Sequence, residues 1–203
     1  MSRESDFYLR RLHSLLGVIP IGLFLTQHLI INYFSTRGED AFNAASDFMG
    51  SLPFLYALEW VVIYIPLLFH AFYGVYIAFT AKSNTKAFST YRNWMFLLQR
   101  ITGVFLVIFI AWHLWQTRIQ KALGAEVNYD MMADVFSSTG MIVFYIAGVL
   151  AATFHLANGL WGFSVTWGIL QSPHSQKVFS YISVIAFVIL AFIGISAIFG
   201  FVK

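Results

Sequence analysis

Five apolar runs, each longer than twenty residues, dominate the chain and leave only short polar segments between them. About twenty apolar residues in a helix cross the hydrocarbon core of a bilayer. A backbone inside lipid must satisfy its own hydrogen bonds, which favours helices for such runs. We therefore predict an all-α integral membrane protein, a single five-helix bundle over residues 1–203. The spans should cover about residues 12–34, 55–81, 93–118, 140–170 and 178–202, with a break at Ser172-Pro173 before the last one.

Charges are rare in this chain, and their distribution predicts its orientation. Only 10% of the residues are charged, against about 25% in a typical soluble domain. Lys and Arg accumulate on the cytoplasmic side of membrane proteins. The side that carries the N-terminus would hold eight bases (Arg3, Arg10, Arg11, Lys82, Lys86, Arg92, Arg100, Lys177) and two acids (Glu4, Asp6). The other would hold four bases (Arg37, Arg118, Lys121, Lys203) and seven acids (Glu39, Asp40, Asp47, Glu59, Glu126, Asp130, Asp134). We expect the N-terminus inside and the C-terminus outside, with segment 39–50 as a short amphipathic helix on the outer surface.

The composition also excludes several functions. The chain has no cysteine, which rules out disulfides, iron–sulfur ligation, c-type haem attachment and thiolate zinc sites within it. A net charge of +3 is too small and too dispersed for nucleic-acid binding. No lysine or carboxylate lies deep in a span, as a transporter or proton pump would require. The sequence contains no dinucleotide fingerprint or phosphate loop.

Four histidines lie inside four different spans: His28, His70, His113 and His155. An ionisable group in the membrane costs about 3 kcal/mol on the translocon scale, so each needs a compensating partner. At about 1.5 Å per residue, His28 and His113 lie roughly 8 Å below the outer edge and His70 and His155 roughly 22 Å below it. Two imidazoles at equal depth on facing helices provide the axial ligands of a haem b. The depths therefore predict two haems, an outer one held by His28 and His113 and an inner one held by His70 and His155.

Other interpretations of the histidines stay open. A single membrane histidine can instead hydrogen-bond a neighbouring carbonyl. A zinc or copper carrier would gather its ligands in one coordination sphere, whereas these form two separated pairs. Gly74 and Gly159, each four residues after a histidine of the inner pair, would let a flat macrocycle approach, although small residues also serve helix packing.

Polar residues near the inner pair are candidates for contacts with haem propionates. His13 and Ser14 share a helix face with His28 at the opposite end of the first span. Arg11, Arg92 and Arg100 carry charge that would neutralise a propionate, although such arginines often only set topology. His13 can equally serve as an interfacial cap. His174, beside Pro173 in the inner loop, has no partner at its depth.

Three motifs carry a family resemblance: FYLRRLHSLLG, RNWMFLLQRITG and HLANGLWGF. Over essentially the whole chain, the sequence resembles the diheme cytochrome b membrane anchor of Gram-positive succinate:menaquinone oxidoreductases. The resemblance implies a multi-pass protein of the bacterial cell membrane with two haems b, and flavoprotein and iron–sulfur subunits as cytoplasmic partners. It also implies electron transfer from the iron–sulfur subunit through both haems to menaquinone, without succinate oxidation by this chain. A fumarate reductase, hydrogenase or formate dehydrogenase cytochrome fits the histidine chemistry equally well.

The quinone would be reduced near the outer surface. Glu59 is the one acid within a span and a candidate proton donor to the quinone, or else an ordinary interfacial acid favoured by the helix dipole. Gln27 and Trp112, beside two of the histidines, are candidates for the quinone pocket, although aromatic residues are common at membrane interfaces.

Overall fold

The computed structural model describes residues 3–202 and contains only helices and connecting loops within that range. Lys203, counted among the outer bases, lies outside the described residues. Five helices are long and apolar enough to cross a membrane, in agreement with the predicted fold class: Glu4–Arg37, Leu55–Thr80, Tyr91–Ala122, Thr139–Thr166 and Pro173–Phe201. The elements are α1 (Arg3–Val18), α2 (Pro20–Tyr33), η1 (Phe34–Arg37), α3 (Glu39–Gly50), α4 (Leu55–Leu58), η2 (Glu59–Tyr64), α5 (Ile65–Thr80), α6 (Tyr91–Leu114), η3 (Trp115–Ile119), α7 (Gln120–Ala122), α8 (Tyr129–Val135), α9 (Thr139–Thr166) and α10 (Pro173–Phe201).

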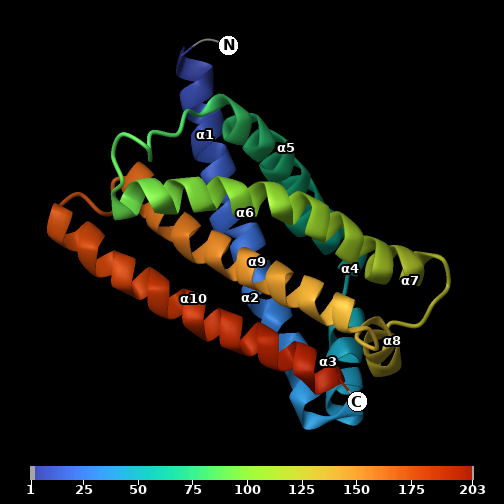
Figure 1. Cartoon of the computed structure of the whole chain (residues 1–203). Coiled ribbons are helices and arrows are strands. Elements are labelled where there is room, and N and C mark those ends of the chain that lie inside the picture. Colours follow the sequence, from blue (N-terminus) through green and yellow to red (C-terminus); the bar gives the residue numbers. More distant parts are fainter. Residues whose placement is uncertain (1–2, 203) are drawn as a thin grey trace.

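The spans form one bundle in which α9 packs against α1, α6 and α10. The α1–α2 helix also contacts α5 and α10, and α5 contacts α6, so the first four spans close into a ring with α10 along one side (Figure 1). We call the end with the start of α1 and the α5–α6 loop the N-terminal face. The opposite end, with α3, α8 and the end of α10, is the C-terminal face (Figure 1).

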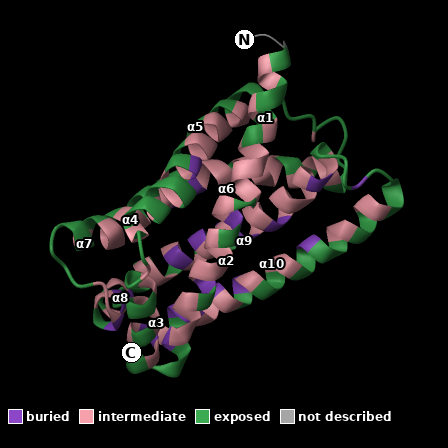
Figure 2. Ribbon diagram, turned by 180° about the vertical axis from the view of Figure 1, so that it is seen from behind, coloured by how far each residue is buried: buried purple, intermediate pink, exposed green. Residues whose placement is uncertain are grey.

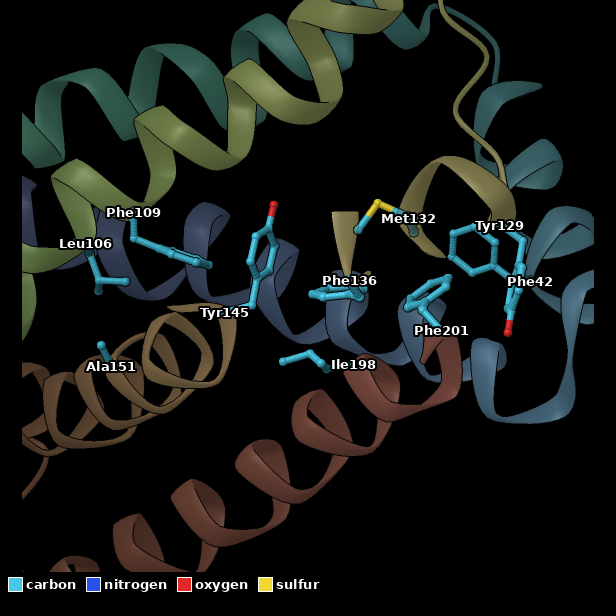
Figure 3. Close-up of a cluster of buried hydrophobic side chains, with 10 residues drawn as sticks. All are labelled: Phe42, Leu106, Phe109, Tyr129, Met132, Phe136, Tyr145, Ala151, Ile198 and Phe201. Carbon is cyan, nitrogen blue, oxygen red and sulfur yellow. The ribbon is translucent and has the colours of Figure 1, made fainter. Parts of the chain in front are cut away.

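Apolar side chains cover the outside of the bundle, as expected for a surface in contact with lipid. Phe72, Phe79 and Phe192 are among the most exposed residues. Buried residues line the contacts between α9, α10 and α2 (Figure 2). A cluster of buried aromatic residues closes the C-terminal face, where Phe42, Phe136 and Phe201 pack together (Figure 3).

Proline sets several helix boundaries, and at one of them the sequence prediction was wrong. The expected last span began at about Val178, after a break at Ser172-Pro173. In the structure α10 begins at Pro173, because proline suits the first helical position and Ser172 and Ser175 form a reciprocal capping box. His174 therefore lies in the first turn of α10 and not in a loop.

Three further boundaries differ from the expected ones by four residues or more, and one of them is the end of the third span, at Ala122 and not at about residue 118. The first span starts at Arg3, well before Leu12, because the charged N-terminal turns continue the same helix. The fourth ends at Thr166 and not at Leu170, because Gly168 adopts a positive φ of 73° and the following amides bond to the Ser164 carbonyl. Segment Glu39–Gly50 forms the expected short helix, α3.

Candidate functional site

The four span histidines come from four different helices and meet as two pairs inside the bundle. The ring centres of His28 on α2 and His113 on α6 are 5.8 Å apart, with planes at 75°. The rings of His70 on α5 and His155 on α9 are 6.1 Å apart, with planes at 85°. The partners that depth along the helices predicted are thus neighbours across the bundle. Within residues 3–202, no group of three or more His, Asp or Glu side chains gathers into a larger ligand set.

Backbone carbonyls hold both rings of the His70/His155 pair, and the Thr102 hydroxyl also lies 3.3 Å from Nδ1 of His155. Nδ1 of His70 lies 3.0 Å from the carbonyl oxygen of His13, and Nδ1 of His155 lies 3.1 Å from that of Gln99. A carbonyl oxygen only accepts, so Nδ1 is the protonated nitrogen in each ring. Each Nε2 therefore keeps its lone pair, which is the arrangement that a metal-binding histidine needs.

Side chains, and not carbonyls, contact the rings of the His28/His113 pair. Nδ1 of His113 lies 3.4 Å from the hydroxyl oxygen of Tyr145, which donates to Oε1 of Gln116 at 2.9 Å. The amide nitrogen of Asn32 lies 3.4 and 3.5 Å from the two ring nitrogens of His28 and donates to that residue's carbonyl oxygen. The two pairs thus differ in what surrounds their ring nitrogens.

Glycines on neighbouring helices make room for the rings of the His70/His155 pair. A Cβ added to Gly17 of α1 would clash with the His70 ring, and one added to Gly103 of α6 would lie 3.0 Å from Cε1 of His155. The two glycines chosen from the sequence occupy other positions: Gly74 faces the His13 ring, and Gly159 faces the Gln99 amide. Gly17 and Gly103 were not among the predicted residues, although they end the motifs FYLRRLHSLLG and RNWMFLLQRITG.

Unpartnered polar atoms gather towards the N-terminal face. The His13 ring stacks on His70 with centres 4.0 Å apart, and its Nε2 is buried without a hydrogen-bond partner. Nε of Arg11 and Nη1 of Arg100 are likewise buried and unpartnered. The other nitrogens of Arg100 donate to carbonyls at the end of α5.

Two of the suggested propionate contacts have partners within the protein. The Ser14 hydroxyl bonds to the Arg11 carbonyl and accepts from the Trp167 indole. The Arg92 guanidinium stacks on the Trp161 ring at 3.7 Å and bonds to Ser180.

Near the C-terminal face, an ion pair joins two π-helical segments. Nη2 of Arg118 in η3 lies 2.6 Å from Oε2 of Glu59 in η2. The Glu59 side chain is only 17% exposed. Nε of Arg118 also donates to the Tyr64 hydroxyl at 3.3 Å. Arg118 and Lys121 line an open pocket of about 540 Å³ together with residues 54–57. That volume lies within the range of about 300–1,000 Å³ typical of small-molecule sites.

None of the three residues suggested for quinone chemistry, Glu59, Gln27 and Trp112, lines this pocket, and Glu59 is joined to it through Arg118. The Gln27 amide contacts the Met49 sulfur at 3.3 Å, and Trp112 is 44% exposed on the outside of the bundle. Arg118 was not among the predicted functional residues. The available signal was a basic residue only five positions after His113 on the same span.

Comparison with known proteins gives two consistent findings. Residues 80–195 match the family described as "Succinate dehydrogenase/Fumarate reductase transmembrane subunit". The chain is also 58% identical over 202 residues to the succinate dehydrogenase cytochrome b558 subunit of Bacillus subtilis (strain 168), and the match covers 100% of both chains.

Proposed function

Because the chain belongs to the succinate dehydrogenase/fumarate reductase transmembrane subunit family, we propose that it anchors a succinate dehydrogenase in the bacterial cytoplasmic membrane and relays its electrons to menaquinone. Flavoprotein and iron–sulfur subunits would dock on the N-terminal face, which we place in the cytoplasm. Two haems b would lie between the helices. The observation that carries the proposal is the pairing of four histidines from four helices, with ring centres 5.8 and 6.1 Å apart.

Each histidine pair would hold one haem iron: His28 with His113, and His70 with His155. Ring centres 5.8 and 6.1 Å apart leave room for a metal ion between the imidazoles of each pair. In His70 and His155 the bond from Nδ1 to a carbonyl leaves Nε2 as the donor atom. Bound haem supplies a centre that takes up and releases one electron. The protein's own part is to hold the imidazoles, exclude water and set the surrounding polarity.

The unpartnered atoms near the N-terminal face fit the carboxylates of a haem. Nε of Arg11, Nε2 of His13 and Nη1 of Arg100 are buried donors or acceptors without a partner in the protein. A buried polar group of this kind costs about 1–3 kcal/mol unless it is satisfied. Propionates of the haem between His70 and His155 would satisfy these groups. Ser14 is a weaker candidate because its hydroxyl is already bonded.

Menaquinone reduction is assigned to the pocket beside Glu59 and Arg118. Arg118 follows His113 by five residues, about 7 Å along the helix, so the pocket lies just beyond the His28/His113 pair. π-helical segments are frequent at functional sites, and here two of them contribute the ion pair. Glu59 does not line the pocket itself, but Arg118 does and lies 2.6 Å from the Glu59 carboxylate, which would deliver a proton to the reduced quinone from that position.

Spectroscopy of histidine variants tests the haem assignment. The purified protein should show a reduced-minus-oxidised b-type spectrum with two haems per chain. Replacing His28 or His113 by leucine should remove one redox component, and replacing His70 or His155 should remove the other. His174→Leu, at the exposed start of α10, is the control and should keep both. A colourless protein from haem-replete cells, or loss of the same component in the His28 and His155 variants, contradicts the proposal.

A separate experiment tests the quinone assignment. Glu59→Gln should slow succinate-driven menaquinone reduction about tenfold or more while both haems stay bound, because proton delivery typically contributes 10²–10⁴-fold. Glu126→Gln removes an exposed acid from the same face and should leave turnover unchanged. If Glu59→Gln turns over like the parent, Glu59 is an interfacial acid and the pocket lies elsewhere.

A further inference from the structure

Tyr145 of α9 is buried against α6, where its ring meets Phe109 and His113. Only 4% of the residue is exposed. Its ring packs edge-on against Phe109 and Phe136, with centres 5.4 and 4.9 Å apart. The hydroxyl points out of this apolar cluster, away from α10 and towards α6 (Figure 3). The packing thus fixes where the oxygen lies.

The hydroxyl connects His113 of α6 with Gln116 of η3, about one turn further along the same span. It donates to Oε1 of Gln116 at 2.9 Å, and its oxygen lies 3.4 Å from Nδ1 of His113. The amide group of Gln116 is oriented by a contact with the Met141 sulfur at 3.7 Å. Because the hydroxyl proton goes to Gln116, the oxygen is left as an acceptor, and Nδ1 of His113 is the nitrogen that carries a proton.

We propose that Tyr145, oriented by Gln116, is the positioning residue of His113: it holds the ring with Nε2 free for the metal and tunes the midpoint potential of the haem bound there. The proposal rests on the haem assignment given above. A hydrogen bond accepted from Nδ1–H makes Nε2 a stronger electron donor, as outer partners of metal-bound histidines generally do. A stronger donor favours the oxidised ion, so the bond lowers the potential of the one-electron couple. Tyr145 itself neither gains nor loses a proton or an electron.

The position of Tyr145 makes this tuning specific to one haem. Nδ1 of His70 and of His155 each bond to a backbone carbonyl, that of His13 and that of Gln99, and the Thr102 hydroxyl also lies 3.3 Å from Nδ1 of His155. Among these four histidines, only His113 has a hydroxyl as the one partner of its Nδ1 within residues 3–202. The amide of Asn32 beside His28 is a hydrogen-bond donor and does not polarise a ring N–H. Tyr145 therefore acts on the His28/His113 site through one ligand, and its effect should not reach the other pair.

The test is a redox titration of Tyr145→Phe in the assembled complex, which removes the hydroxyl and keeps the ring. We expect the potential of the His28/His113 haem to rise by an amount equivalent to up to about a tenfold change in the one-electron equilibrium, about 59 mV. The low-spin ferric EPR signal of that haem should shift as the His113 ring loses its anchor. The other haem should keep its potential and its signal. Tyr129→Phe is the matched control, because it removes a buried hydroxyl that donates to the Gly200 carbonyl in the same cluster.

A second variant shows whether Gln116 acts through Tyr145. Gln116→Leu alone should raise the same potential by a smaller amount, and it should add nothing in the Tyr145→Phe background, because residues that act in series are not additive. Additive shifts, equal shifts of both haems, or an unchanged potential with both haems bound would overturn the inference and leave the haem assignment standing. If Tyr145→Phe loses the haem, Gln116→Leu decides alone, and an unchanged potential overturns the inference. A parent protein without haem would instead contradict the proposed function.

Discussion

A histidine inside a membrane helix can serve as a ligand only if its ring is held in one orientation. For His70 and His155 two constraints act together: a carbonyl fixes Nδ1, and a glycine on the neighbouring helix leaves space for the carbon side of the ring. A side chain at Gly17 or Gly103 would displace the ring of His70 or His155. Interiors are packed so closely that even one added methyl group is destabilising.

Gly17→Ala is predicted to weaken binding of the haem between His70 and His155. The added Cβ would clash with the His70 ring and turn Nε2 away from its position. We expect haem content to fall from two per chain towards one, with the His28/His113 component retained, measured by pyridine haemochrome and redox titration. Gly162→Ala on α9 is the control, because its Cβ would meet nothing within 4 Å. If Gly17→Ala still binds two haems per chain, the His70 ring can shift away from the added Cβ and remain a ligand, which contradicts the prediction.

The sequence allowed prediction of the histidine partners but not of the residues that orient them. Depth along an apolar span follows from counting residues, so His28 could be matched with His113 without a structure. Whether Gly17 faces His70 depends on how each helix is rotated about its axis. Helices that are apolar on all sides carry little periodic signal for that rotation. For the same reason Gly74, chosen for its spacing from His70, faces His13 instead.

At the scale of the elements, close packing of α10 on the first span holds the C-terminal face together. Gly200 lies directly against the backbone of Ser35 and Thr36 in η1, and the Ser35 hydroxyl donates to the Ala197 carbonyl at 2.8 Å. Small residues let membrane helices approach this closely. The contact fixes α2, and therefore His28, relative to the end of α10.

Gly200→Ala is predicted to destabilise the protein without removing any ligand. A Cβ would lie 2.7 Å from the Thr36 amide nitrogen, which belongs to backbone and cannot turn aside. Overpacking of this kind costs about 1–3 kcal/mol, so the melting temperature should fall by roughly 5 °C. Tryptophan fluorescence during heating of the detergent-solubilised protein measures the shift. Gly50→Ala, where the Cβ is unobstructed, should melt like the parent, and equal melting of all three proteins would contradict the close contact.

The existence of each span could be predicted from hydrophobicity, whereas the ends depended on local hydrogen bonding. The Ser172-Pro173 pair is polar and contains proline, so it resembled a loop. It is instead a helix start, since the capping side chains of Ser172 and Ser175 and the proline at the first position all favour one. The ion pair between Glu59 and Arg118 could not be predicted, because its residues lie 59 positions apart on separate spans.

For the whole molecule, the asymmetry of charge predicts which face meets the cytoplasm. Eight of the twelve Lys and Arg residues belong to the N-terminal face, and seven of the nine acids to the opposite one. The proposed electron flow, from cytoplasmic subunits to the pocket beside Glu59, requires this orientation. With the reverse orientation, the His28/His113 pair and the pocket would lie nearer the cytoplasm. Electrons from cytoplasmic subunits would then reach the His28/His113 haem before the His70/His155 haem, opposite to the proposed order.

Because the chain contains no cysteine, single cysteines can report this orientation directly. Ala87 in the α5–α6 loop and Ala125 between α7 and α8 are exposed alanines on opposite faces. In spheroplasts, a membrane-impermeant maleimide should label Ala125→Cys and not Ala87→Cys. Inverted vesicles stripped of peripheral subunits, which would otherwise cover the loop, should give the opposite pattern. The cysteine-free parent should stay unlabelled in both preparations. Labelling of Ala87→Cys in intact spheroplasts would place the N-terminal face outside, and the direction of electron transfer proposed for this subunit would then be wrong.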